Sequence, residues 1–176
     1  MAAASPPTIS GISACCVSNM KFTLNGALTI GTLDGANVEI REAVGADNFF
    51  LFGMTVEQVS ALTRDGYRPE DRLRENPELA GALDLLASGH FSRHEPGVFR
   101  PVADDLRYHD PYMVLADFGS YAACQQRVSD VWIDQDRWTR MSILNASRAG
   151  RFSSDRAIRE YSDEIWHVPP IRIEKD

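Results

Sequence analysis

The stretch LTIGTLDGANVEI at residues 28–40, followed by NFFLFG at residues 48–53, decides the fold class of this chain. Residues 28–33 are rich in β-forming side chains and end on an Asp-Gly turn. A helix is predicted over residues 36–44, and the apolar run that follows is typical of a strand buried on both faces of a parallel sheet. A strand, a helix and a second strand form a βαβ unit, so the sequence predicts an α/β fold.

Helices are predicted on both sides of this unit. A short helix should begin at or near Lys21, because Asn25-Gly26 stops a helix before the first strand. Helices dominate the rest of the chain, with only one more short strand expected, at residues 111–116. Few strands therefore lead and many helices follow, which is the pattern of the C-terminal part of a Rossmann-like, doubly wound domain with an incomplete sheet.

The start and stop signals of these later helices are residue types with a capping role. Gly66, Gly89 and Gly150 are predicted helix ends, residues 89–101 are a predicted loop, and Pro169-Pro170 should close the last helix. The predicted starts are Thr55 with Gln58 as a capping box, Asn76 before Pro77, Asp117, and Ser154.

The composition indicates a soluble globular protein of one compact domain. Of the 176 residues, 44% are apolar and 24% charged, and no apolar run approaches the roughly 20 residues that span a bilayer. Arginines are interleaved with acidic residues at a net charge of −7, which argues against a nucleic-acid partner. Three cysteines form neither a disulfide framework nor a metal clip, which favours a reducing cytoplasm.

Taken alone, few residues point to chemistry. Lys21 follows the pattern of either a surface lysine or a buried amine able to form a Schiff base. Residues 34–37 join a strand to a helix N-terminus, where they either receive an anion or simply connect the two elements with Asp or Asn as the cap. His90 and His94 lack a third ligand, so no metal site is predicted, and Ser153 and Ser154 look like a helix start and not a nucleophile.

The run NMKF at residues 19–22, with LNGALTIGTLDGANVE at residues 24–39, closely resembles the cofactor-lysine segment of the glycogen, starch and maltodextrin phosphorylases. Further signatures of that family follow in the same order, namely NFF and FG at 48–53, WTRM at 138–141, FSSDR at 152–156 and EIW at 164–166. The resemblance covers residues 19–169. It leaves residues 1–18 as a leader, expected to be disordered and outside the family, and 170–176 as a tail.

The resemblance implies a glycosyltransferase B-type fold and phosphorolysis of an α-1,4-glucan to glucose 1-phosphate. It implies that Lys21 binds pyridoxal 5'-phosphate covalently, and no other site residue is assigned. The implied partners are the glucan and phosphate, with either a second copy of the chain or a separate N-terminal lobe. No membrane partner is expected.

Residues 13–18 depart from the family pattern. They read SACCVS where the family has Glu-Ala-Ser-Gly-Thr-Gly, which removes a carboxylate and two glycines that let the backbone approach an anion. The rest of a two-lobed enzyme is also missing, so we expect a truncated or mis-started product that is inactive alone. The alternative is a non-catalytic remnant that acts as a packing or interaction module.

Overall fold

The computed structural model describes residues 16–93, 95, 97–169 and 171. The chain length predicts one domain, yet the structure divides into two compact units. Unit 1 comprises Met1–Leu51 and Gln126–Asp176, and unit 2 comprises Phe52–Gln125. The described part of the chain is mostly helical, and its strands pair in one short parallel sheet.

The predicted βαβ unit is present in unit 1. Strand β1 (Ile30–Gly31) pairs in parallel with β2 (Phe50–Leu51), and α2 (Ala36–Val44) followed by the 3-10 turn η1 (Ala46–Asn48) connects them. Both strands are shorter than predicted. Just beyond β1, the Thr32 carbonyl accepts from the Asn37 side-chain amide at 3.1 Å and not from a neighbouring strand.

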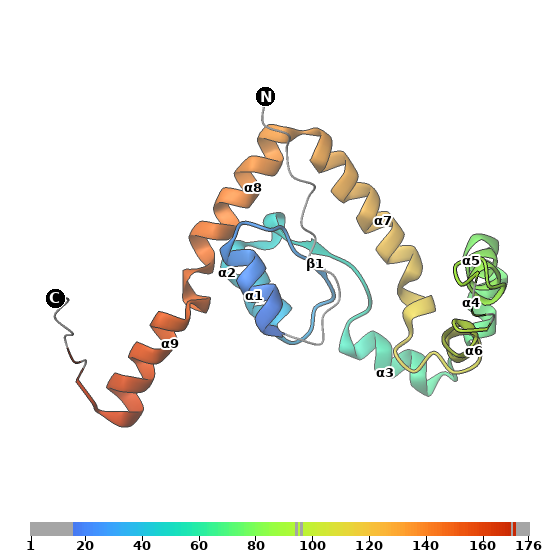
Figure 1. Cartoon of the computed structure of the whole chain (residues 1–176), viewed down its shortest axis with the longest axis horizontal. Coiled ribbons are helices and arrows are strands. Elements are labelled where there is room, and N and C mark those ends of the chain that lie inside the picture. Colours follow the sequence, from blue (N-terminus) through green and yellow to red (C-terminus); the bar gives the residue numbers. More distant parts are fainter. Residues whose placement is uncertain (1–15, 94, 96, 170, 172–176) are drawn as a thin grey trace. The chain divides into compact units, whose positions relative to one another are not determined.

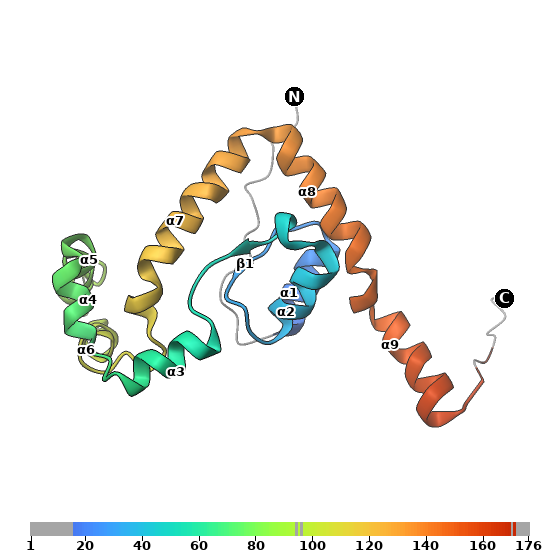
Figure 2. The same ribbon diagram turned by 180° about the vertical axis from the view of Figure 1, so that it is seen from behind.

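Helices α1 (Cys16–Leu24) and α2 lie side by side next to the sheet, and α8 (Gln135–Arg148) packs against both (Figures 1 and 2). Ile40, Val44 and Phe49 form the buried core between them, and Phe152 packs against that core. Arg148 donates from Nη1 to the Val44 carbonyl at 2.7 Å, so α8 satisfies the C-terminal end of α2. Unit 1 is thus stabilised by an apolar core and by the hydrogen bond from Arg148 to Val44 beside that core.

Helix α1 extends further toward the N-terminus than predicted. It begins at Cys16, so Lys21 lies in its last turn and not near its start. The predicted stop is confirmed, since Gly26 has φ +80° and the N–H of Ala27 donates to the Phe22 carbonyl at 3.0 Å. The residues before Lys21 include no proline or glycine from Cys16 onward, so nothing in the sequence ends the helix there.

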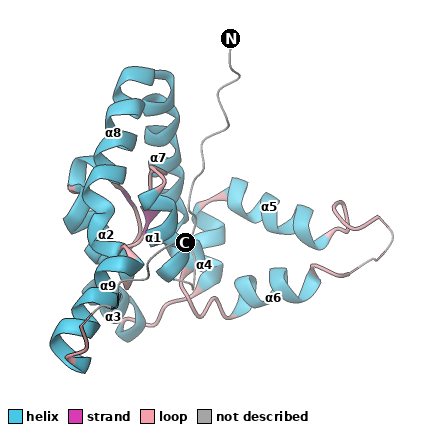
Figure 3. Ribbon diagram, turned by 60° about the vertical axis from the view of Figure 1, so that its left-hand side comes forward, coloured by secondary structure: helices cyan, strands magenta, loops and turns pink. Residues whose placement is uncertain are grey.

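Unit 2 contains α3 (Val56–Arg64), α4 (Pro69–Glu75), α5 (Pro77–Ala87), α6 (Arg100–Tyr108) and the start of α7 (Val114–Ile133). Helices α5 and α6 run side by side (Figure 3). Two predicted caps are confirmed: Thr55 and Gln58 form a capping box, and the Asn76 side chain accepts from the N–H of Leu79 at 3.0 Å. Leu79, Leu83 and Leu115 form the core of this unit.

The strand predicted at residues 111–116 is wrong, because α7 already begins at Val114. The Asp110 carboxylate accepts from the N–H groups of Val114 and Leu115, each at 2.9 Å, and so satisfies the first turn of the helix. Asp117, the predicted cap, lies inside that first turn and accepts from the N–H of Met54 at 2.9 Å. Burial raises the pKa of Asp117 above its usual value.

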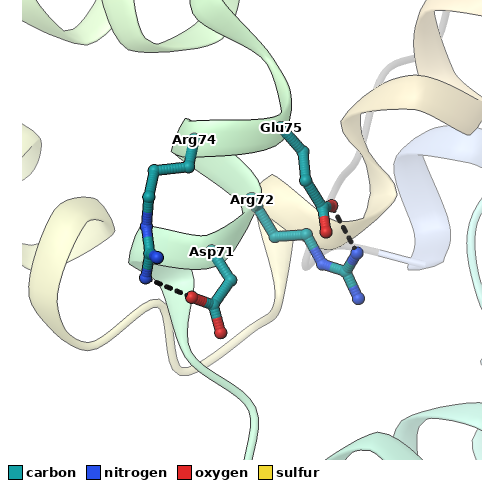
Figure 4. A network of polar contacts seen from close by, with 4 residues as sticks. All are labelled: Asp71, Arg72, Arg74 and Glu75. Carbon is teal, nitrogen blue, oxygen red and sulfur yellow. Dashed lines mark hydrogen bonds and ion pairs between the residues drawn. The ribbon is translucent and has the colours of Figure 1, made fainter.

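Helices α4 and α6 were not expected from the sequence. Each is short and has a proline in its first two positions, and α6 begins inside the predicted loop, at Arg100. Two ion pairs lie along α4, Arg72 with Glu75 at 2.8 Å and Arg74 with Asp71 (Figure 4). Both pairs are partly exposed, so each contributes little to stability.

The C-terminal segment of unit 1 begins after α8 with the 3-10 turn η2 (Ala149–Phe152), which contains the predicted stop, Gly150. Helix α9 (Ser154–Glu160) starts where predicted and continues as the π-helix η3 (Tyr161–Trp166). It ends at His167, which has φ +53°, while Pro170 lies outside the described residues. Large apolar side chains are exposed on this helical segment and just after it: Ile158, Ile165, Trp166 and Val168.

Candidate functional site

Lys21 is exposed in the last turn of α1. Its backbone carbonyl accepts from the Asn25 side chain at 3.0 Å, and no described carboxylate lies within ion-pair distance of its ammonium group. The predicted alternative of a buried amine is therefore not what the structure shows. Among the described residues, nothing covers the Lys21 side chain to the point of burial, so the side chain is accessible to solvent.

The face of α1 opposite Lys21 is buried and tied to its neighbours. Thr23 is fully buried, and its hydroxyl donates to the Asn19 carbonyl at 2.8 Å and lies 3.4 Å from the Thr29 hydroxyl. Asn19 is only 5% exposed, and its Nδ2 donates to Asn37 Oδ1 at 3.2 Å. Residues 19 and 23 are one helical turn apart, so they share a face that Lys21 does not.

The turn from β1 into α2 has the second candidate residues, 34–37. Gly35 is the N-cap of α2, with φ +47° and no side-chain cap, so neither Asp nor Asn has the predicted capping role. Asn37 instead turns back toward β1, where its Nδ2 donates to the Thr32 carbonyl at 3.1 Å. The sequence analysis missed this bridge because it considered residues 34–37 only as an anion-binding turn or as a connection capped by Asp or Asn.

The residues at hand fit one part of a pyridoxal phosphate site. Lys21 has the position of a surface lysine, and its exposed amine, with no carboxylate of the described residues beside it, is accessible to an aldehyde. The cofactor's phosphate would need several backbone N–H donors, and residues 13–18, the segment to which the resemblance assigns them, lie only partly within the described residues. Cys16, Val17 and Ser18 of that segment form the first turn of α1. The lysine is therefore accessible for attachment, whereas residues 13–18 lack the glycines that the resemblance implies for a phosphate-binding segment.

The remaining candidates have structural roles or lie outside the described part. Ser153 is the N-cap of α9 and accepts from the N–H of Arg156 at 3.2 Å, which confirms the predicted helix start. His90 packs edge-on against Phe91, and His94 is not among the described residues. Within the described ranges, no three metal-ligating side chains are grouped, and no helix is both long and apolar enough to span a bilayer.

Sequence reasoning also missed a polar cluster in unit 2. Asp110 is 1% exposed and accepts from the Tyr67 hydroxyl at 2.6 Å in addition to its two helix N–H groups. Burial and the neighbouring carboxylate raise the pKa of Tyr67 well above its usual range. Only the His-Asp-Pro sequence before α7 could have indicated a turn here, and nothing local indicates the partner 43 residues away.

The comparisons with known proteins agree with the family resemblance that the residues around Lys21 indicated. The family model described as carbohydrate phosphorylase matches residues 7–168, and this match begins inside the predicted leader. Glycogen phosphorylase of Synechocystis sp. is 53% identical over 156 residues, which are 89% of this chain and 18% of that protein. The muscle forms of Ovis aries and Homo sapiens are 48% and 47% identical over 162 residues, which are 92% of this chain and 19% of theirs.

The matched region is thus about a fifth of the length of these relatives. It nevertheless includes almost all of the chain, and it includes Lys21 with the strand, turn and helix that follow. On these grounds the chain belongs to the carbohydrate phosphorylase family.

Proposed function

We propose that this chain is the C-terminal segment of an α-1,4-glucan phosphorylase and that Lys21 is its attachment point for pyridoxal 5'-phosphate. The observation that carries the proposal is the position of Lys21, exposed on α1 immediately before the β1–α2–β2 unit, within a run that resembles the family's cofactor segment. The corresponding complete fold would be of the glycosyltransferase B type, with this segment closing its Rossmann-like C-terminal lobe.

When bound, pyridoxal phosphate supplies a phosphate group that exchanges a proton with the substrate phosphate. In this chain the role of Lys21 is to hold the cofactor covalently through its side-chain amine. The role of the buried face of α1, through Asn19 and Thr23, is to keep the lysine directed outward. The substrates of the whole protein would be the non-reducing ends of a glucan and inorganic phosphate, and its product glucose 1-phosphate.

We propose that the 176-residue chain is inactive alone and acts, if at all, in association with the remainder of a phosphorylase or with a second copy of itself. Its compartment would be the cytoplasm. Exposed apolar side chains on α9 and η3, such as Ile165 and Trp166, support a surface that another protein segment covers. The same observation favours the second candidate function, a non-catalytic interaction module.

A labelling experiment tests the role of Lys21. The chain has only two lysines, Lys21 and Lys175, so the second is an internal reference. The chain is incubated with pyridoxal 5'-phosphate, reduced with borohydride and mapped by peptide mass spectrometry. We expect labelling of Lys21 to exceed that of Lys175 by about tenfold, the change for one modest binding contribution of about 1.4 kcal/mol.

Labelling with pyridoxal, which lacks the phosphate, provides the control. If the first turn of α1 still holds a phosphate, then the preference for Lys21 should fall with pyridoxal. Equal labelling of Lys21 and Lys175 by pyridoxal 5'-phosphate would contradict the proposed attachment point. It would favour the interaction module instead.

A further inference from the structure

We propose that Asn37 is a positioning residue for Lys21: its side-chain amide fixes α1 against β1 and the start of α2, and so sets the direction in which the lysine points. The inference rests on the proposed function of Lys21 and adds a residue 16 positions further along the chain. Asn37 does not touch Lys21 in the described contacts. It acts through Asn19, on the same helix as the lysine.

One amide joins three segments of unit 1. Asn37 lies in the first turn of α2, its Oδ1 accepts from Asn19 Nδ2 of α1 at 3.2 Å, and its Nδ2 donates to the Thr32 carbonyl just beyond β1 at 3.1 Å. Both groups of the amide are used, so its orientation is fixed by two different partners.

The space for this amide exists because residue 31 is glycine. A Cβ built on Gly31 would lie 2.6 Å from Asn37 Nδ2, closer than real Cβ contacts come. Asn19 depends on the contact in turn, since its Oδ1 is buried with no hydrogen-bond partner in the described structure. Removing the Asn37 amide would therefore leave the buried Asn19 side chain without its bond to α2, a costly state for a polar group.

The consequence for Lys21 follows from helical periodicity. Asn19 and Thr23 are four residues apart, so they lie on one face of α1, and Lys21, two residues from each, lies on the opposite side. A helix of nine residues is marginal on its own, so tertiary contacts decide its position. Among the described residues, the Asn19–Asn37 bond is the side-chain hydrogen bond that joins this face to α2.

Hydrogen exchange of the unlabelled full chain provides the first test. In Asn37→Ala, the amides of α1 should exchange about tenfold faster than in the wild type, because the loss of buried hydrogen bonds raises the population of the detached helix. The matched control is Asn145→Ala. Asn145 is another buried amide of unit 1, with Nδ2 bonded to the carbonyls of Asn48 and Met141 and no bond to α1.

Labelling provides a readout that a merely structural role would not change. The ratio of trapped pyridoxal 5'-phosphate on Lys21 to that on Lys175 should fall about fivefold in Asn37→Ala, and Asn145→Ala should retain the wild-type ratio. Asn19→Ala removes only the bond to Asn37 and should give most of this fall, whereas Asn37→Ala also removes the bond to the Thr32 carbonyl. The double variant should therefore fall no further than Asn37→Ala. Asn37→Asp keeps an acceptor for Asn19 Nδ2 and should recover part of the ratio.

The proposal is overturned if Asn37→Ala leaves both the α1 exchange and the labelling ratio unchanged, or if Asn145→Ala changes them equally at matched stability. If Asn37→Ala does not fold, the same measurements on Asn37→Asp and Asn19→Ala decide it. A wild-type ratio near one would refute the cofactor role of Lys21, and the exchange of α1 would then decide the role of Asn37 independently.

Discussion

The 176-residue chain, given glycogen, phosphate and pyridoxal 5'-phosphate, is expected to release no measurable glucose 1-phosphate. Enzymes accelerate reactions by about 10⁶-fold or more, and most of that comes from charges and substrates held in a closed, preorganised cleft. The chain spans only 18–19% of the length of these relatives, so the 176 residues by themselves would supply a small part of such a cleft. We therefore expect no release of glucose 1-phosphate above the detection limit of the assay.

The cofactor should also be lost when the mixture is passed through a desalting column. An imine to Lys21 is reversible, and stable retention needs a phosphate held by several N–H groups and a ring packed in a dry pocket. Lys21→Ala serves as the blank for both the absorbance of the bound cofactor and the release of sugar phosphate. Near-stoichiometric cofactor after desalting, or activity that Lys21→Ala abolishes, would show that this expectation is wrong.

Replacing Asp110 with alanine should lower the free energy of unfolding of unit 2 by about 3–5 kcal/mol. The carboxylate is 1% exposed and accepts from the N–H groups of Val114 and Leu115 and from the Tyr67 hydroxyl. The substitution leaves all three donors without their acceptor at the start of α7. A domain of ordinary stability has only about 5–15 kcal/mol in total, so unit 2 would be largely destabilised.

Two variants and one spectroscopic property make the test specific. Tyr67→Phe removes one donor and should cost about 1 kcal/mol, and Asp110→Asn, which keeps one good acceptor, should fall between the two. All three tryptophans, Trp132, Trp138 and Trp166, lie in unit 1, so their fluorescence follows that unit. Hydrogen exchange of the amides at the start of α7, measured at increasing urea concentrations, reports the unfolding of unit 2. An equal effect of Asp110→Ala and Tyr67→Phe would contradict the role of Asp110 as the cap of α7.

The same cluster makes unit 2 sensitive to alkali. Burial, the hydrogen bond to Asp110 and its charge raise the pKa of Tyr67 well above the usual value, so the folded state favours the neutral phenol. A raised folded pKa stabilises the fold below the unfolded pKa of about 10, and this contribution is lost as the pH rises from there through the folded value. The stability of unit 2 should thus decline above about pH 10, and Tyr67→Phe should decline less.

The sequence predicts those parts of the fold that are coded by neighbouring residues. The capping box of Thr55, the cap of Asn76 and the stop at Gly26 are local patterns, and each is found in the structure. The start of α7 was mispredicted because the carboxylate that caps it belongs to Asp110, four residues before Val114. Asp110 also accepts a hydrogen bond from Tyr67, which lies between α3 and α4. Contacts over such separations leave no periodic signal in the sequence.

The candidate site shows the same division. Lys21 was predicted to be the cofactor lysine because the residues around it, 19–22 and 24–39, resemble the cofactor segment of the family. Its exposure and its place in the last turn of α1 depend on where the helix begins, and no local pattern marks Cys16 as that point. The Asn19–Asn37 bond joins residues 18 apart and requires the fold of β1 and α2 to bring them together. Local sequence indicated the lysine that we propose as the attachment point, whereas the contact that we propose positions it is found only in the tertiary structure.

A chimera tests most directly whether this chain is a phosphorylase segment with Lys21 as its cofactor lysine. Residues 19–169 would replace the aligned residues of the Synechocystis glycogen phosphorylase, 53% identical to this chain, and a second chimera would also take residues 13–18. The account predicts that the first chimera binds pyridoxal 5'-phosphate and phosphorolyses glycogen, that Lys21→Ala abolishes both, and that the second chimera is inactive. A first chimera that folds but neither binds the cofactor at Lys21 nor releases glucose 1-phosphate would contradict it.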